Sequence, residues 1–365
     1  MKIKKLLSNI YKYSVNSLFK KIYGEIHFYK NKRYSHNVKI NFVKNKNIKH
    51  PYNQPYKVFK IKDGRISTDN VENVAIIDKN RIINDVSYQQ IKGKLKSAQF
   101  NSALYKGTPY IQKKVYGKVL SLTQGASGHT NYFHWLYDIL PKIKLYSEKY
   151  DPKLLNFLYI HQLKEYQKIT LRLIGLDKIK ILESDKYRHV SSNEIFAVNH
   201  PWYYRGKILD EAKKVPQWII KWLKKDFLPQ RKKFKANEKV FIDRSESRFN
   251  HCQIHNNEEV INFLENRGFT SYKVGELPFQ KQIYLFNNAK IIIGAHGAAF
   301  ANLAFCKPKT KIIEIKPIYN PNTVNKSISK INSLNYKLIN TPKLSKDRRL
   351  NGDIILNLKT IKNNL

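Results

Sequence analysis

The stretch AKIIIGAHGAAFANLAF, residues 289–305, decides the fold of the second half of the chain. Its three consecutive isoleucines are typical of a strand that is buried on both faces, as in a parallel sheet. Gly294 and Gly297 then allow a tight turn and a close approach of the backbone to a ligand. A helix is expected after Gly297, and its free N–H groups and positive dipole end can bind a phosphate. The stretch therefore predicts a strand, a ligand-binding turn and a helix in succession.

The same alternation continues on both sides of this stretch. Strands are expected at 239–243, 270–274, 310–315 and 336–340, and helices at 256–268, 278–288 and 323–333. Strands that alternate with helices of about ten residues indicate parallel βαβ units. A similar pattern begins near residue 128, where NYFHWLYDIL is expected to be a helix stopped by Pro141. The sequence thus predicts an α/β protein with two Rossmann-like lobes that face each other across a cleft.

Four segments are expected along the chain. Residues 1–30 form a basic amphipathic helix, 31–230 an N-terminal lobe, 231–345 a C-terminal Rossmann-like lobe, and 346–365 a C-terminal tail or helix. In the first segment, apolar side chains fall on one stripe of a helical wheel. Such a helix suits an anionic membrane surface. A helix docked on its own domain is the alternative, and the sequence leaves both open.

Composition narrows the classes of partner. The chain has 365 residues, with 68 Lys and Arg against 27 Asp and Glu, which gives a net charge of +41. Such an excess favours nucleic acid, an acidic membrane face or a phosphorylated substrate. Two cysteines exclude a disulfide scaffold and favour a reducing compartment. The sequence shows neither a membrane span nor a cleaved signal peptide, so we expect a cytoplasmic protein.

Two residues near the central turn are candidates for ligand binding. His296 stands in the turn itself, where its side chain faces the crevice at the carboxyl end of the strand. Glu314 ends the next strand, where an acid can accept hydrogen bonds from ribose hydroxyls. A strand-end carboxylate that faces water is the alternative for Glu314.

The strand at 239–243 runs directly into a basic cluster. Arg244, Ser245 and Arg248 follow it, and arginine presents a planar fork of donors that fits phosphate. At the carboxyl end of a parallel strand, Arg244 points into the same crevice as the turn at Gly294 and Gly297. Asp243 is expected to pair with one of the two arginines. A solvated charge cluster is the alternative.

The N-terminal lobe offers a second candidate site. Spacings of i, i+3, i+4 and i+7 align Asn131, His134, Trp135 and Asp138 along one stripe of a helix. A histidine and an aspartate four residues apart can act as a base and its orienting partner, and either can take a proton from a hydroxyl. A metal held by His129, His134 and Asp138 is a weaker alternative, because their spacing matches no zinc motif.

The ordered set of motifs resembles glycosyltransferase family 61, in particular its bacterial capsular-polysaccharide members. The resemblance covers about residues 120–316. It rests on NYFHWLYDILPK (131–142), FIDRS (241–245), NNEEV (256–260), GF (268–269), LFNNA (285–289), GAHGAAFANLAF (294–305) and PKTKIIEI (308–315).

The resemblance implies a two-lobed GT-B fold and transfer of a sugar from a nucleotide sugar with inversion, without a metal or another cofactor. The donor side would hold Arg244, Ser245, His296, Gly297, Ala298, Asn302 and Glu314, with Gly294 and Arg248 beside them. The acceptor side would hold Asn131, His134, Trp135 and Asp138. Asp138 is the favoured base by resemblance, with His134 as the alternative.

These roles make an enzyme of surface-polysaccharide synthesis the expected function, with a capsular or lipopolysaccharide glycan as acceptor. Arg244 and the helix after Gly297 would neutralise the leaving diphosphate, and His296 would donate to the phosphates or the sugar. The basic N-terminus would hold the enzyme at the inner face of the cell membrane, near a lipid-linked acceptor. Nucleic acid is not an expected partner.

Two positions depart from the family pattern. Asp243 replaces a serine, and Ala299 replaces a glycine, so a methyl group narrows the approach to the phosphate. The competing class is a non-enzymatic RNA or polyanion binder, which the net charge, 24 Tyr and 18 Phe favour. No RNA-binding motif supports it. A Rossmann-type oxidoreductase is disfavoured, because the glycines are spaced G-x-x-G and not G-x-G-x-x-G.

Overall fold

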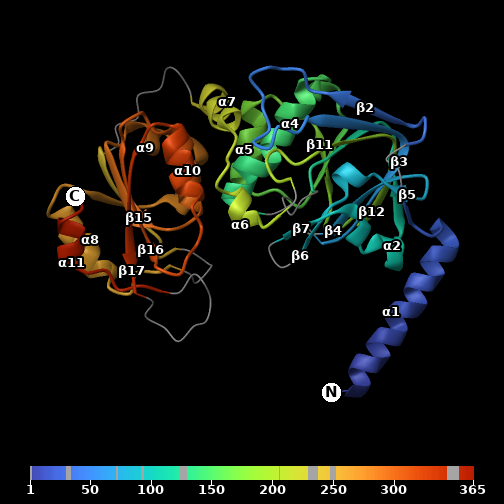
Figure 1. The fold of residues 1–365 in the computed structure, drawn as a ribbon, viewed down its shortest axis with the longest axis horizontal. Coiled ribbons are helices and arrows are strands. Elements are labelled where there is room, and N and C mark those ends of the chain that lie inside the picture. The colour runs from blue at the N-terminus through green and yellow to red at the C-terminus, as the bar shows by residue number, and fades with distance from the viewer. Residues whose placement is uncertain are drawn as a thin grey trace. The chain divides into compact units, whose positions relative to one another are not determined.

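The computed structural model describes residues 2–29, 34–70, 73–91, 94–123, 130–204, 206–228, 237–246, 252–342 and 353–365. The chain divides into two compact units, Met1–Glu211 and Ala212–Leu365 (Figure 1). This division precedes helix α7 (Gln217–Phe227), whereas the sequence analysis placed the boundary after residue 230. The helix goes with the C-terminal unit because Lys224 donates to the Cys306 carbonyl at 2.7 Å and to Asn332 Oδ1 at 2.9 Å.

The C-terminal unit is built on a five-stranded parallel sheet. Its strands are β13 (Lys239–Asp243), β14 (Thr270–Lys273), β15 (Ile291–Ala295), β16 (Lys311–Pro317) and β17 (Asn335–Thr341). The connections contain α8 (Asn257–Glu265), η5 (Val274–Glu276), α9 (Phe279–Asn288), η6 (Ala298–Phe305) and α10 (Val324–Ile331). The expected βαβ alternation is confirmed here.

The order of these strands creates a binding crevice. In space they run β14-β13-β15-β16-β17, and every neighbouring pair is parallel. The chain leaves β13 for β14 on one side and then returns to β15 on the other side. Connections that leave two adjacent strands in opposite directions open a crevice at the carboxyl ends of those strands, where α/β proteins bind ligands. In this unit the crevice lies between the ends of β13 and β15.

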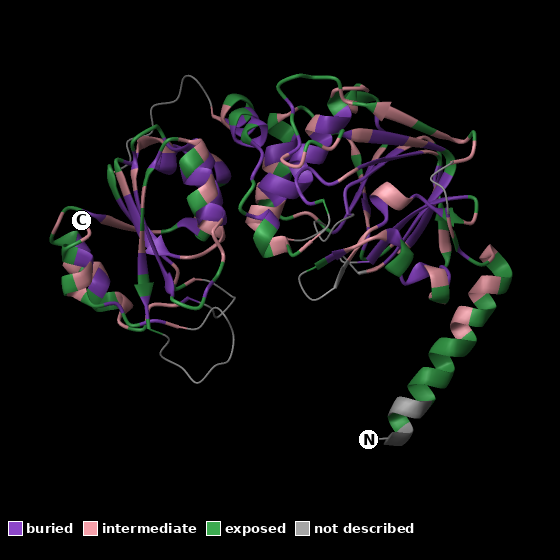
Figure 2. Cartoon of the chain, in the orientation of Figure 1, coloured by how far each residue is buried: buried purple, intermediate pink, exposed green. Residues whose placement is uncertain are grey.

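The C-terminal tail belongs to the core of this unit. Ile354 forms a parallel bridge with Ile254, and the tail ends in α11 (Leu358–Lys362). Ile354 and Ile361 are fully buried in the cluster that also contains Phe241 and Ile293. Burial of these side chains stabilises the tail against the sheet. Figure 2 shows the buried strands at the centre of the unit.

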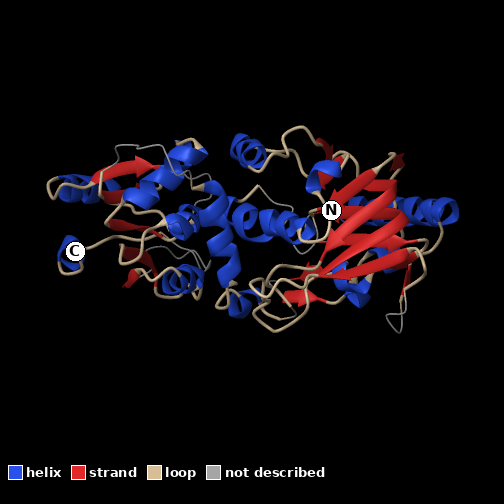
Figure 3. Cartoon of the chain, turned by 90° about the horizontal axis from the view of Figure 1, so that it is seen from above, coloured by secondary structure: helices blue, strands red, loops and turns tan. Residues whose placement is uncertain are grey.

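The N-terminal unit has a 12-stranded mixed sheet (Figure 3). Its longest strands, β3 (Lys57–Asn70) and β12 (His189–Val198), pair antiparallel. Beyond β12, strands β9 (Lys118–Ser121), β10 (Phe157–Ile160) and β11 (Lys180–Glu183) are parallel. The remaining strands are β1 (His27–Phe28), β2 (Val38–Phe42), β4 (Asn73–Asp78), β5 (Arg81–Ile82), β6 (Gln89–Ile91), β7 (Lys94–Lys96) and β8 (Gln112–Lys114).

The Rossmann-like expectation therefore holds in the N-terminal unit only for the parallel part. That part contains α4 (Leu140–Ser147) after β9 and α5 (Glu165–Leu173) after β10. The antiparallel part differs because its strands are joined by hairpins. Strands β4 and β5 are joined by only two residues, and Lys79 there has a left-handed φ of 51°. A connection this short forces antiparallel pairing.

Short helices complete the unit. They are η1 (Asn84–Val86), η2 (Ala98–Phe100), α2 (Ala103–Lys106), η4 (Pro152–Leu154) and α6 (Ile208–Glu211). The expected N-terminal helix is confirmed as α1 (Lys2–Tyr23). At its end, the Tyr23 hydroxyl accepts from the Gln112 N–H at 3.0 Å. None of the helices in the described part of the chain combines the length and apolarity that a membrane span requires.

Candidate active site

A π-helical turn shapes the predicted site of the N-terminal unit. Here α3 (Tyr132–His134) runs into the π-turn η3 (Trp135–Ile139) and then into α4. The prediction that Pro141 stops the helix is wrong, because Pro141 lies in the first turn of α4. Proline cannot donate the helical hydrogen bond to the residue four positions before it. The wider turn accommodates this loss, and the Leu140 N–H donates to the Trp135 carbonyl.

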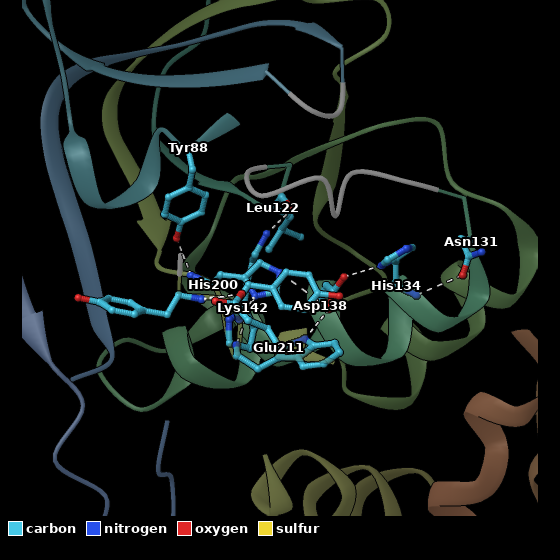
Figure 4. A network of polar contacts seen from close by, with 12 residues as sticks. Tyr88, Leu122, Asn131, His134, Asp138, Lys142, His200 and Glu211 are labelled. Carbon is cyan, nitrogen blue, oxygen red and sulfur yellow. Dashed lines mark hydrogen bonds and ion pairs between the residues drawn. The ribbon is translucent and has the colours of Figure 1, made fainter. Parts of the chain in front are cut away.

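His134 and Asp138 form a close contact in the site (Figure 4). His134 Nδ1 lies 2.6 Å from Asp138 Oδ2, and Asp138 Oδ1 accepts from Trp202 Nε1 at 2.6 Å. The Asp138 side chain is 1% exposed, whereas that of His134 is 33% exposed. The expected His–Asp pair is therefore present. Its carboxylate is enclosed and its imidazole reaches the surface.

The charges around Asp138 favour an ionised carboxylate. Burial alone would raise the pKa of Asp138, but the charge and hydrogen bond of His134, with His200 and Trp202, outweigh it and lower the pKa below its usual value. His200 Nε2 lies 3.8 Å from Asp138 Oδ1. Burial lowers the pKa of His200 to about 3, so its ring is neutral at pH 7. Its Nδ1 accepts from the Trp202 and Tyr203 N–H groups, so the proton sits on Nε2 and faces Asp138.

Lys142 lies one turn further along the same helix. Its side chain is fully buried, and its Nζ donates to the Leu122 carbonyl at 3.1 Å, just beyond the end of β9 (Figure 4). Burial lowers the pKa of Lys142 to about 7, although Asp138 acts in the opposite direction. A buried cation near Asp138 supports the ionised state of that carboxylate.

The other two predicted residues of this stripe, Asn131 and Trp135, support the helix and its packing. Asn131 caps α3, and its Oδ1 accepts from the Phe133 N–H at 2.9 Å and the His134 N–H at 3.4 Å. Trp135 is fully buried, and its Nε1 donates to Thr170 Oγ1 of α5 at 2.8 Å. The structure thus separates the Trp135 ring from the His134–Asp138 pair. Asn131 acts on His134 by holding the start of its helix.

Trp202, His200 and Lys142 were not among the site residues predicted from the sequence. The first two follow the end of β12 in the run NHPWYY, residues 199–204. A cluster of aromatic and histidine side chains after a strand is a usable signal, although the contact with Asp138 spans 64 residues. Lys142 gives only the weaker signal of a lysine within an apolar helix.

In the C-terminal unit, Arg244 lies at the carboxyl end of β13. Its Nη1 donates to the carbonyl of His296, which follows β15. Gly297 makes room for it, because a Cβ at this position would collide with the Arg244 guanidinium. Glycine is needed at position 294 for a different reason, because a Cβ there would lie 2.7 Å from the Cβ of Ile242 on the paired strand. Of the two glycines, Gly297 therefore shapes the site and Gly294 the sheet.

Asp243 organises the turn after β13. Its Oδ1 accepts from the Ser245 N–H and from Asn257 Nδ2, both at 2.9 Å, and its Oδ2 accepts from Ser245 Oγ at 2.9 Å. Asp243 is thus bonded to Ser245 and Asn257, and its expected pairing with Arg248 is not tested. Ser245 itself is exposed. Arg248 lies outside the described residues.

His296 and Glu314 form a second histidine–carboxylate pair. His296 Nδ1 contacts Glu314 Oε1, which also accepts from Asn325 Nδ2 at 2.7 Å. Glu314 Oε2 accepts from the Tyr336 hydroxyl. Burial alone would raise the pKa of Glu314, but these three partners, His296 first, lower it. The side chains of Glu314 and His296 are 1% and 12% exposed. Glu314 is thus enclosed by groups of the chain itself, and His296 is the member nearer the surface.

The segment after Gly297 is a 3₁₀ helix, η6, rather than an α-helix. Ala298 begins it and is half-buried. Asn302 is fully buried, and its Nδ2 donates to Gln282 Oε1 of α9 at 3.2 Å. The structure therefore places Asn302 in the interior of the unit, while Ala298 lies at the predicted helix N-terminus.

A pocket opens at the predicted crevice. It has a volume of about 170 Å³ and lies at the ends of β13 and β15. Its lining includes Arg244, Ser245, Gln253, Asn257 and Ala295. Burial lowers the pKa of Arg244, but a guanidinium stays charged at any physiological pH. The pocket thus offers one fixed cation and several hydrogen-bonding groups, which suits a phosphate.

The metal site considered from the sequence lies only partly within the described residues. Among the residues that the structure describes, no group of three or more His, Cys, Asp or Glu side chains is placed to hold an ion. His129, one of the three candidate ligands, lies outside them.

Residues 132–313 match the family model described as Glycosyltransferase 61. No curated protein matches the chain. Solved structures with some similarity include the iron-containing dodecameric glycosyltransferase TibC from enterotoxigenic E. coli H10407, at 12% identity and a TM-score of 0.32, covering 77% of this chain and 78% of that one. TibC in complex with ADP-D-beta-D-heptose gives 12% identity, a TM-score of 0.31 and coverages of 79% and 80%. The family match identifies the chain as a glycosyltransferase.

Proposed function

We propose that this glycosyltransferase moves a sugar, with inversion, from a nucleoside diphosphate sugar to a hydroxyl of a surface glycan, on a fold of the GT-B type. A bacterial capsular polysaccharide or lipopolysaccharide is the proposed acceptor. The observation that carries the proposal is the contact of Arg244 with the His296 carbonyl across Gly297, at the switch point of a parallel sheet. It sets a cation where such sheets bind nucleotides.

The donor role belongs to the C-terminal unit. Arg244 and the first N–H groups of η6 face the diphosphate, whose negative charge grows as the bond to the sugar breaks. His296 donates to the same phosphates through Nε2, because its Nδ1 is directed at Glu314. Since both Glu314 oxygens accept hydrogen bonds from the chain, we propose that Glu314 positions His296 and does not contact the ribose. Ser245 and the backbone at Ala298 complete the proposed donor contacts.

The acceptor role belongs to the N-terminal unit, with His134 as base. Both oxygens of Asp138 are engaged and its side chain is 1% exposed, whereas His134 is 33% exposed. The carboxylate accepts the proton of His134 Nδ1, which leaves Nε2 to receive a proton. We therefore prefer His134 to Asp138 as the base and assign Asp138 the orienting role.

The reaction balances as a single displacement. The acceptor oxygen bonds to the anomeric carbon, the bond from that carbon to the diphosphate oxygen breaks, and His134 takes the hydroxyl proton. The negative charge leaves on the nucleoside diphosphate. A retaining double displacement would need an accessible carboxylate nucleophile, and Asp138 is enclosed. One displacement inverts the anomeric configuration.

We further propose that α1 holds the enzyme on an anionic membrane surface, at the cytoplasmic face. Leu7, Ile10, Leu18 and Ile22 on this helix are each more than half exposed. Lys20 and Lys21 add positive charge in its last turn. Apolar side chains beside lysines are the composition of a helix that lies in the headgroup region. A lipid-linked acceptor would be reached from there.

Release of nucleotide from a panel of UDP-, GDP- and ADP-sugars tests the transferase proposal. We expect release from the sugars of one nucleotide, and we expect Arg244→Ala to lower it by at least about tenfold. His134→Ala should lower kcat by about 100-fold or more, because it removes the base, and should leave the KM for the donor unchanged. The control is Lys290→Ala, which removes an exposed charge of the same unit. Turnover by Arg244→Ala at the wild-type rate would contradict the donor assignment.

A further inference from the structure

We propose that a second pocket of the N-terminal unit binds one uncharged sugar residue of the acceptor glycan. The inference rests on the transferase function proposed above and adds a place where the acceptor is held. The pocket is formed by four segments, 50–57, 84–88, 95–97 and 199–204, that are far apart in the sequence. All four belong to the same compact unit.

Aromatic rings form part of the pocket wall. The ring of Tyr203 stacks on that of His200, with centroids 4.3 Å apart and planes at 9°. Tyr204 is 41% exposed, and its ring lies 6.2 Å from Tyr52 and 6.4 Å from His50. The face of an aromatic ring is electron-rich and attracts the C–H groups on the flat side of a sugar ring. A wall of this kind grips a sugar without requiring charge on it.

Polar groups of the lining match sugar hydroxyls. Lys57 Nζ and Asp85 Oδ2 form an ion pair at 2.6 Å, and the other N–H groups of the Lys57 ammonium can donate to sugar hydroxyls.

The charge balance favours an uncharged ligand. Lys57 is compensated by Asp85, and Lys96 Nζ lies 5.2 Å from the centre of the Phe100 ring. Burial lowers the pKa of His50 to about 4, so this ring is neutral at pH 7. A phosphate or nucleotide is better held by a planar guanidinium fork, such as Arg244 supplies in the other unit, than by a single lysine ammonium. A hexose or similar sugar requires no such fork.

Buried side chains connect the wall of the pocket to the proposed base. His200 is part of its wall, and the same imidazole is 3.8 Å from Asp138, which holds His134. Figure 4 shows Tyr88, His200, Asp138 and His134 in succession. A sugar in the pocket would therefore be a neighbour of the sugar whose hydroxyl reacts. The pocket would select the acceptor and direct its reactive hydroxyl toward His134.

Saturation-transfer NMR tests this site with glucose, galactose, N-acetylglucosamine and rhamnose as probes. We expect the wild-type protein to bind at least one of them at millimolar concentration. Tyr204→Ala should weaken that binding by at least about tenfold. The matched control is Tyr116→Ala, because Tyr116 is 69% exposed in the same unit and is absent from the pocket lining. It should bind as the wild type does.

A second variant addresses the pocket without removing a ring. Ser97 is half-buried and lines the pocket, so Ser97→Trp should fill it and abolish sugar binding. Melting temperatures of all variants show whether they fold. The proposal is overturned if no probe binds the wild type, if neither pocket variant weakens binding, or if a nucleoside diphosphate displaces the sugar.

Nucleotide binding, measured on the same samples, separates this proposal from the transferase function. Binding of UDP, GDP or ADP should be equal in wild type and Tyr204→Ala, because the donor contacts lie in the other unit. Sugar binding that depends on Tyr204, without any nucleotide binding, would support the pocket and contradict the transferase proposal. Nucleotide binding without sugar binding would support the transferase proposal and contradict the sugar pocket.

Discussion

Replacing Gly297 by alanine is expected to remove donor binding selectively. The new Cβ would collide with the guanidinium of Arg244, which crosses the backbone at this position. The backbone at Gly297 is extended, with a φ of 177°, so alanine adopts it without strain. The flexible end of Arg244 must therefore move and lose its hydrogen bond to the His296 carbonyl. The perturbation displaces the cation and leaves the strands unchanged.

The magnitude follows from the bonds that Arg244 makes. A hydrogen bond between a charged donor and a phosphate contributes about 1.5–3 kcal/mol. Its loss should weaken nucleotide binding by about 10- to 150-fold. The cost in stability is that of one internal hydrogen bond, about 0.5–1.5 kcal/mol. Gly297→Ala should therefore lose much of its nucleotide affinity while its melting temperature falls only slightly.

Calorimetric titration with the nucleoside diphosphate that binds best measures this effect. Arg244→Ala alone should lose as much affinity as the double variant Arg244→Ala/Gly297→Ala, because both changes remove the same interaction. Wild-type affinity in Gly297→Ala would refute the reasoning. The reasoning would also be refuted if the affinity losses of the two single variants added up in the double variant.

Gly294→Ala is the matched contrast on the same strand. Its Cβ would lie 2.7 Å from the Cβ of Ile242, a fully packed neighbour that cannot move aside. Such overpacking costs about 1–3 kcal/mol of stability. The melting temperature should fall by roughly 2–4 °C per kcal/mol for a unit of this size. The folded fraction should keep its nucleotide affinity, which is the opposite outcome to that of Gly297→Ala.

Three further predictions concern charge. The pKa of Asp138 is lowered in the folded state, so the ionised carboxylate stabilises the fold at neutral pH, and this contribution disappears as the pH falls below about 4. In urea unfolding, Asp138→Asn should be less stable than the wild type at pH 7, and the difference should shrink in acid. The pKa of Lys142 is about 7 in the folded protein, against 10.5 for a free lysine side chain, so the unfolded chain binds more protons between these two pH values. The free energy of unfolding should therefore rise by about 2 kcal/mol from pH 7 to 9, and this rise should be absent in Lys142→Met. Removal of residues 2–23 should abolish salt-sensitive binding to anionic vesicles, and unchanged sedimentation with them would exclude α1 as the anchor.

The C-terminal unit was predictable because its signals are local. The isoleucines of β15, the glycines after it and the charged end of β13 each specify an element within a few residues. The contact of Arg244 with Gly297 was harder to foresee. It depends on β13 and β15 being neighbours, and they are 52 residues apart at that contact. Only the strand order of the sheet makes them so.

The N-terminal unit was predicted less well because hairpins and irregular helix compete with the βαβ pattern. The antiparallel pairing of β3 with β12 joins distant segments, and no local periodicity indicates it. At Pro141 the rule that proline ends a helix was outweighed by a π-turn, which keeps the chain helical. That turn holds His134 against Asp138 and directs Trp135 to Thr170. The sequence stripe placed all three on one face.

The most direct test of the central claim is the melting temperature of the protein with UDP, GDP, ADP and CMP. A ligand that binds only the folded state raises its stability by about 2.7 kcal/mol at 100 times the dissociation constant. The account predicts a rise with one nucleoside diphosphate, retained in Lys290→Ala and lost in Arg244→Ala. No rise with any nucleotide, or an equal rise in Arg244→Ala, would contradict the placement of the donor at the ends of β13 and β15.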